Sequence, residues 1–155
     1  SITSYSEGIY LRHTYDDNDE RFNQWIQQNR QNLNGFLGIG GQNLTMFRAG
    51  SDFPPNHVGA MIYTKGRVFY NELENMIGRD AFEAALHNYF EDMKFKFSSP
   101  YDLMVHFEET SGQDLDAFFY EWVGEFDGLD PAVIAAAEDR PLETTETEPQ
   151  TQIIG

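Results

Sequence analysis

The strongest constraint on the fold is a succession of apolar stripes at helical spacing between residues 63 and 124. In the first stripe, Phe69, Leu73, Met76 and Ile77 follow one another at i, i+4, i+7 and i+8, which places them on one face of a helix. Similar stripes occupy residues 82–93, 103–107 and 115–122. The short connections between them predict helices that pack as antiparallel or steeply crossing neighbours. No segment alternates as a strand does, so the predicted fold class is all-α, a bundle-like array of helices.

Start and stop signals separate these stripes. Acidic residues are expected to open two of the helices, and serine followed by proline opens a third. A glycine follows three of the four stripes, as is common at the C-terminal end of a helix. In chain order these signals are Gly78, Asp80, Ser99–Pro100, Gly112, Asp114 and Gly124.

Two further helices are predicted before this array. Ser4 and Glu7 have the spacing of a capping box, which predicts a short helix from Ser4 to about His13. The acidic cluster "DDNDE" (16–20) predicts the start of a second helix that ends near Gly35. Residues 35–60 are rich in glycine, proline and asparagine and are expected to form a long loop. Loops longer than about 15 residues in compact domains are commonly functional.

The C-terminal end has a different composition. Asp130 and Pro131 predict the start of a short alanine-rich helix, "PAVIAAAED". The stretch "RPLETTETEPQTQ" that follows is typical of a solvated linker or tail. We therefore expect residues 1–130 to be the helical part of one domain, and residues 131–155 to be a short helix with an acidic, partly disordered tail.

Charge excludes one class of partner. The chain of 155 residues has a formal net charge of −16, and most of the excess acid lies after residue 90. A chain this acidic, with no basic patch, is repelled by phosphate backbones, so nucleic acid is not an expected partner. No stretch approaches the roughly 18 apolar residues of a membrane-spanning helix.

The residues that could bind a metal do not form a recognisable set. The chain contains no cysteine, so any metal would be held by histidine and carboxylate side chains. No two of the four histidines have the His-x-x-x-His spacing that brings two imidazoles together on one helix face. Glu83, His87 and Glu91 share a helix face, and His106 lies near Glu109, but both groups are expected to be solvated surface. Taken alone, these residues do not assemble an active site.

Several segments nevertheless resemble the gluzincin metallopeptidases of the M1 aminopeptidase family. "SEGIYLRHTY" (6–15) is similar to the family's "NEGFA-x-Y" stretch, and "YTKG" (63–66) is similar to its "YEKG" motif. "NMIGRDAFEAALHNYF" (75–90) and "DLMVHFEETSGQDLDAFFYEWV" (102–123) resemble the helical segment that follows in the family. The resemblance covers about residues 4–126, with its landmarks in the family's order.

The resemblance implies roles for two residues. Glu7 matches the family's third zinc ligand, a carboxylate near the start of a helix. Tyr63 matches the catalytic tyrosine, whose phenol donates a hydrogen bond to the oxyanion of the tetrahedral intermediate. Lys65 and Gly66 are then expected to turn the chain into the helix that follows. Without the resemblance, Glu7 is explained as the third residue of the Ser4 capping box and Tyr63 as a core aromatic.

Two motifs of the family are absent. The His-Glu-x-x-His segment, which supplies two zinc ligands and the general base, would fall before Ser1. "GAMIY" (59–63) matches only the Gly and Met of the family's Gly-x-Met-Glu-Asn, which helps to bind the substrate's amino terminus. The chain is therefore expected to be a fragment of a zinc aminopeptidase that acts on peptides with a free N-terminus, completed by the rest of the parent polypeptide. Alone, it is expected to be inactive and to hold no stoichiometric zinc.

Two other classes of function remain open. One is a non-catalytic member of the family that keeps the peptidase scaffold as a binding or assembly module. The other is a self-standing acidic helical interaction domain, in which the N-terminal segment would pack independently and no cleft would lie at Tyr63.

Overall fold

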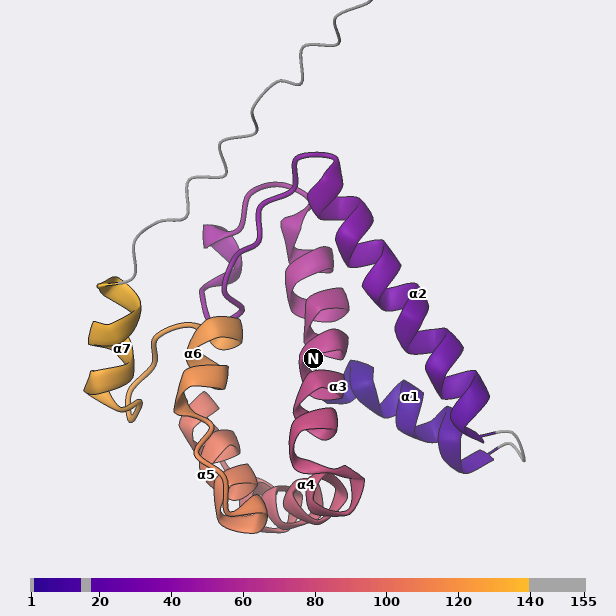
Figure 1. Cartoon of the computed structure of the whole chain (residues 1–155), viewed down its shortest axis with the longest axis vertical. Coiled ribbons are helices and arrows are strands. Elements are labelled where there is room, and N and C mark those ends of the chain that lie inside the picture. Colours follow the sequence, from indigo (N-terminus) through magenta and orange to yellow (C-terminus); the bar gives the residue numbers. More distant parts are fainter. Residues whose placement is uncertain (1, 15–17, 140–155) are drawn as a thin grey trace, which may run out of the picture.

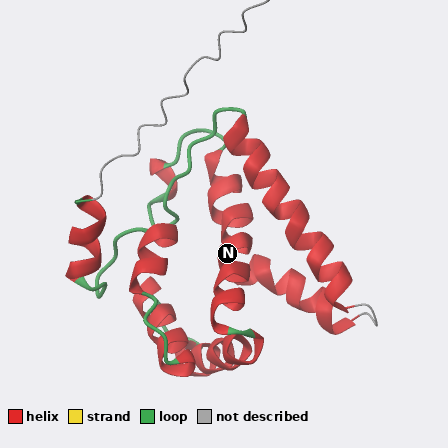
Figure 2. Cartoon of the chain, viewed as in Figure 1, coloured by secondary structure: helices red, strands yellow, loops and turns green. Residues whose placement is uncertain are grey.

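A computed structural model describes residues 2–14 and 18–139. In these ranges the chain forms seven α-helices and no strand, which confirms the all-α fold class (Figures 1 and 2). The α-helices are α1 (Ile2–Thr14), α2 (Asn18–Gly38), α3 (Lys65–Ile77), α4 (Arg79–Met93), α5 (Pro100–Ser111), α6 (Asp116–Val123) and α7 (Pro131–Glu138). A 3₁₀ turn, η1 (Gly50–Asp52), and a π-helical segment, η2 (Gly59–Thr64), lie between α2 and α3.

Helix α3 runs through the centre of the molecule. Figure 1 shows α1 and α2 on one side of it and α5, α6 and α7 on the other, while α4 crosses its C-terminal end. The main core is unusually rich in aromatic rings, and its fully buried members come from six of the helices: Tyr5, Phe22, Phe69, Phe82, Phe107 and Phe119. A smaller cluster, Leu33, Phe53, Met61 and Val68, packs between α2 and the start of α3.

Most of the apolar stripe that the sequence predicts on α3 is buried in the structure. Phe69 and Leu73 are fully buried as predicted, but Met76 is 46% exposed. Tyr70, which the stripe does not include, is buried because α1 covers that side of α3. The central helix is therefore buried on more than one face.

The helix boundaries differ from the sequence prediction at the N-terminal end. Helix α1 begins at Ile2, so Ser4 lies inside the helix and is buried rather than serving as its cap. Helix α2 continues through Gly35 to Gly38, because Phe36 and Leu37 pack against the smaller core cluster. Tertiary packing here outweighs the low helix propensity of glycine.

The long loop is shorter than expected, since α2 runs to Gly38 and helical backbone resumes at His57, two residues before η2. η2 continues directly into α3, so Lys65 and Gly66 do not turn the chain; both lie buried within one helical segment. Residues 39–58 remain as the connection. Their path is held against α6 by two backbone hydrogen bonds, from the amides of Met46 and Phe47 to the carbonyls of Trp122 and Val123.

Most of the later signals are confirmed, with two corrections. Ser99 and Asp102 form a reciprocal capping box with Pro100 in the first turn of α5, and Asp130 caps α7. Gly78, Gly112 and Gly124 end α3, α5 and α6. The N-caps of α4 and α6 are Gly78 and Leu115, so neither Asp80 nor Asp114 is a cap.

The expected acidic tail from residue 140 lies outside the described residues. Among the described helices, none combines the length and apolar character needed to cross a bilayer.

Candidate functional site

Glu7 lies on the outer face of α1, with 59% of its side chain exposed. Its carboxylate oxygen Oε2 accepts a hydrogen bond from Nη2 of Arg67 on α3, at 2.8 Å. Because α1 begins at Ile2, Glu7 is not the third residue of a Ser4 capping box. The capping explanation of Glu7 is therefore wrong, and its partner comes from a helix 60 residues further along the chain.

The glycine after Glu7 has a packing role. A Cβ atom at Gly8 would lie 2.5 Å from Cζ3 of Trp25 and 2.8 Å from its Cε3, which is closer than packed carbon atoms approach. The bare backbone of Gly8 therefore allows α1 to lie directly on the indole ring of α2. The close packing of Gly8 on Trp25 therefore helps to fix the distance between α1, which carries Glu7, and α2.

Tyr63 lies in η2, one helical turn before Arg67. It is 51% exposed, so the interpretation as a core aromatic is wrong. Its hydroxyl makes no hydrogen bond within the described residues. Its neighbour Met61 is fully buried in the smaller core cluster, so the backbone beneath the exposed phenol is held by packing. π-Helical turns occur preferentially at functional sites.

Arg67 links Glu7 to the helical segment that carries Tyr63. It stands in α3, four residues after Tyr63 of η2, and its guanidinium contacts Glu7 on α1. Its Nη1 also donates to Oδ1 of the buried Asn29 at 3.1 Å. Helix α1 thus packs on α2 and α3 rather than independently.

Lys65, the lysine of "YTKG", is a structural residue in this chain. It is buried, and its Nζ donates to Oδ1 of Asn43 at 2.9 Å and to the carbonyl of Leu44 at 2.8 Å. Burial lowers the pKa of Lys65, although the negative charge of Glu121 opposes the shift. The lysine ties the connection 39–58 to the start of α3, directly behind Tyr63.

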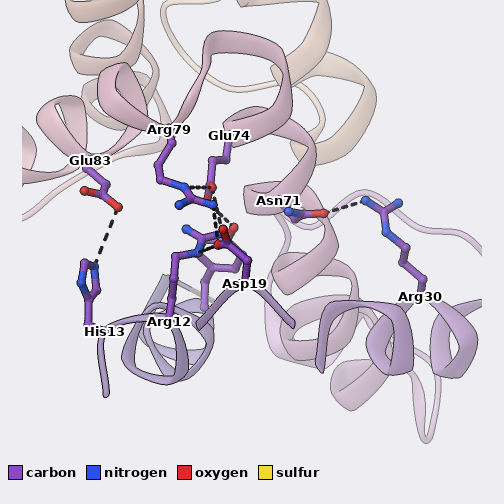
Figure 3. Close-up of polar contacts among 9 residues, drawn as sticks. Arg12, His13, Asp19, Arg30, Asn71, Glu74, Arg79 and Glu83 are labelled. Carbon is purple, nitrogen blue, oxygen red and sulfur yellow. Dashed lines mark hydrogen bonds and ion pairs between the residues drawn. The ribbon is translucent and has the colours of Figure 1, made fainter. Parts of the chain in front are cut away.

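A partly buried ionic cluster, with Arg12 and Glu74 buried and Asp19 and Arg79 exposed, holds the inner side of α1 (Figure 3). Arg12 donates to Oε1 of Glu74 at 2.9 Å, and the phenol of Tyr5 donates to Oε2 of the same carboxylate at 2.7 Å. Arg79 contacts Glu74 at 3.5 Å and Asp19 at 2.8 Å. Burial, together with the hydrogen bond to Glu74, raises the pKa of Tyr5. The cluster joins the first four α-helices at one point.

The histidines do not approach Glu7. His13 and Glu83 lie 3.8 Å apart across α1 and α4, with both side chains largely exposed, as Figure 3 shows. His106 contacts Asp92 at 3.2 Å, and His87 is exposed. His87 fits the expectation of solvated surface, whereas the expectation is wrong for His106, whose side chain is only 15% exposed because its ring bonds the carbonyl of Asp102 and lies against Tyr89.

One group of carboxylates in the described part of the chain has metal-like spacing, formed by Glu108, Asp114 and Asp116. Each of these side chains accepts a backbone amide: from Leu115 at 2.8 Å, from Asp116 at 3.1 Å and from Asp130 at 2.9 Å, respectively. The group therefore orders the turns on either side of α6.

Glu7 has the chemistry of one zinc ligand. Arg67 contacts only one of its two oxygens, and the side chain is open to solvent. A catalytic zinc site needs three protein ligands, and the described residues form no group of three possible ligands that includes Glu7. This part of the chain therefore fits a contribution to a zinc site that other residues complete.

Comparison with family models identifies the "Peptidase family M1 domain" over residues 2–122. The chain belongs to peptidase family M1. Searches of curated proteins and of solved structures returned no match.

Sequence reasoning missed Arg67 and Asn29, and it missed the packing role of Gly8. Arg67 does stand four residues after Tyr63, a spacing that places it on the same helix face. No pattern in the sequence indicates that Glu7 is its partner. That contact depends on how α1 packs against α3.

Proposed function

We propose that this chain is part of a zinc-dependent aminopeptidase, with Glu7 as a zinc ligand and Tyr63 as the oxyanion donor. The observation that carries the proposal is that the segment matching the family holds an exposed Glu7, bound by Arg67, and an exposed Tyr63 four residues before Arg67. The substrate is a peptide with a free amino terminus.

Each residue has a defined task in this proposal. When bound, zinc supplies a water whose pKa is lowered to about 7 and which can act as a nucleophile at neutral pH. Glu7 offers one carboxylate oxygen as a ligand. The phenol of Tyr63 donates a hydrogen bond as negative charge develops on the carbonyl oxygen of the scissile bond. The general base and two further ligands come from outside this chain.

The test replaces the phenol in the complete protein. Tyr63→Phe should lower kcat for a dipeptide substrate by about 10²–10³, the usual effect of losing one oxyanion donor. Tyr101→Phe, which removes a hydroxyl from a partly exposed tyrosine on α5, should leave kcat unchanged. A wild-type kcat in Tyr63→Phe would refute the proposed role. An N-acetylated version of the same peptide should not be hydrolysed if a free amino terminus is required.

The isolated 155-residue chain gives a second test. Because it offers a single ligand beside Tyr63, we expect no stoichiometric zinc after dialysis and no peptide hydrolysis. Zinc bound at one equivalent and lost in Glu7→Gln would contradict this part of the proposal.

One observation favours a non-catalytic member of the family. The ion pair with Arg67 already neutralises Glu7, so the local charge is balanced without a metal. A scaffold protein would keep this pair and bind no zinc even as the complete polypeptide. Metal analysis of the complete protein therefore separates the two functions.

A further inference from the structure

We propose that Arg67 is the positioning residue of Glu7. It holds one oxygen of the proposed zinc ligand and ties that ligand to the helix that carries Tyr63. This inference rests on the proposed function, and it concerns a residue outside the "SEG" and "YTKG" motifs.

The hydrogen bond from Arg67 determines which carboxylate oxygen of Glu7 is free to bind a metal. Nη2 of Arg67 donates to Oε2 at 2.8 Å, while Oε1 has no partner within the described residues. One oxygen is thus held by the protein and the other is available. A carboxylate arranged in this way presents a single oxygen in a defined direction, whereas an exposed glutamate without such a partner samples several rotamers.

Arg67 can orient Glu7 because its own side chain is immobilised. Nη1 donates to Asn29 at 3.1 Å, and the amide nitrogen of Asn29 donates in turn to the carbonyl of Trp25 at 2.8 Å. The guanidinium carbon lies 5.6 Å from the centre of the Trp25 ring. These contacts fix the fork of Arg67 on α2 and α3 before Glu7 approaches from α1.

The geometry around Arg67 also carries an unfavourable element. Its Nε is buried and has no hydrogen-bond partner. Leaving a buried donor unpaired costs free energy. The two terminal nitrogens of Arg67 nevertheless bond two different helices, Nη2 with Glu7 on α1 and Nη1 with Asn29 on α2. The planar fork of the guanidinium makes both bonds possible at once, which a single positive charge does not.

A positioning role differs from a surface ion pair in its consequence. Exposed ion pairs contribute little to stability. Hydrogen-bond partners of metal ligands act on the metal instead, and their removal typically weakens metal binding by about 10–100-fold. Zinc affinity is therefore the quantity that distinguishes the two roles.

The experiment titrates the metal-free complete protein with zinc in competition with a chromophoric chelator. Glu7→Gln should lose high-affinity zinc. Arg67→Met should bind zinc about 10–100-fold more weakly, and Arg67→Lys, which keeps the charge but cannot reach two partners, should show a smaller loss. The matched control is Arg30→Met, which removes an arginine of α2 that pairs with Glu72 on α3 away from Glu7.

Each outcome has one meaning. Unchanged or tighter zinc binding in both Arg67 variants, with Glu7→Gln impaired, overturns the positioning role and leaves the proposed function standing. Unchanged zinc binding in Glu7→Gln, or a complete wild-type protein that binds no zinc, refutes the proposed function itself. Thermal unfolding of the metal-free variants is the second measurement, because a purely structural role would lower the Tm of Arg67→Met without changing the zinc affinity of the folded protein.

Discussion

Replacing Tyr5 with phenylalanine should change how the stability of this protein depends on alkaline pH. Tyr5 is fully buried, and its phenol donates to the carboxylate of Glu74 at 2.7 Å. Burial and this hydrogen bond raise the pKa of Tyr5 in the folded state. In the unfolded chain the phenol titrates near its usual value of about 10.

The magnitude at neutral pH follows from the lost hydrogen bond. Hydrogen bonds to charged groups contribute about 1.5–3 kcal/mol. Glu74 keeps Arg12 at 2.9 Å and Arg79 at 3.5 Å, so its charge remains paired in the variant. We therefore expect Tyr5→Phe to lower the free energy of unfolding by about 2 kcal/mol near neutral pH.

The stability difference between the wild type and Tyr5→Phe shrinks above the unfolded-state pKa of tyrosine. There the unfolded chain loses the Tyr5 proton while the folded protein keeps it, so wild-type stability falls by about 1.4 kcal/mol per pH unit from this group. Tyr5→Phe has no phenol at this position, so its free energy of unfolding does not fall for this reason. The difference between the two proteins should therefore shrink from about 2 kcal/mol at about pH 8 to about 0.6 kcal/mol at about pH 11.

Urea unfolding followed by circular dichroism at a series of pH values measures this difference. Every other titrating group is present in both proteins, so its contribution to the pH dependence largely cancels in the difference between their free energies of unfolding. Tyr10→Phe, which alters a 62% exposed tyrosine on the same helix, is the control and should match the wild type throughout. A stability difference between wild type and Tyr5→Phe that stays constant from neutral to alkaline pH would refute the account of Tyr5.

Five further substitutions, at four positions, test other parts of the structure. Gly8→Ala should lower the free energy of unfolding by about 1–3 kcal/mol through overpacking against Trp25, while Gly35→Ala, at an open position inside α2, should raise it by about 0.5–1 kcal/mol. Lys65→Met should speed hydrogen exchange in the connection 39–58, which Lys65 tethers. The lowered pKa of Lys65 means that the folded state binds fewer protons, so wild-type stability should rise with pH between that lowered pKa and about 10.5, and this rise should be absent in Lys65→Met. Ser99→Ala should cost about 1 kcal/mol in thermal or urea unfolding, whereas Ser99→Asp keeps a capping oxygen and should cost less.

The later helices could be predicted because their signals are local. A capping box at Ser99, a proline at Pro131 and glycines at helix ends act within a few residues of the backbone they control. The structure follows these signals closely from α3 to α7. The family resemblance was also visible in the sequence, and the family match confirms it.

The N-terminal boundaries could not be predicted from local signals. Ser4 and Glu7 have the spacing of a cap, yet α1 starts earlier because Tyr5 and Ser4 are drawn into the interface with α2 and α3. Gly35 signals an end, yet α2 continues because the apolar residues after it have a core cluster to join. In both places long-range packing decides between two locally acceptable helix ends.

The difference between local signals and long-range packing also explains why the candidate residues of the site could be predicted but their contacts could not. The motifs point to Tyr63 and Glu7, but the hydrogen bond between Arg67 and Glu7 spans 60 residues of sequence and depends on how α1 packs. Tyr5 and Glu7 stand two residues apart on α1 and so point to opposite sides of it. The inner side is fixed by Tyr5 and Arg12 on Glu74, and the outer side presents Glu7 to Arg67. A buried cluster with no access to substrate therefore determines where Glu7 stands, so that loosening Tyr5 should displace Glu7 even though neither residue touches the other.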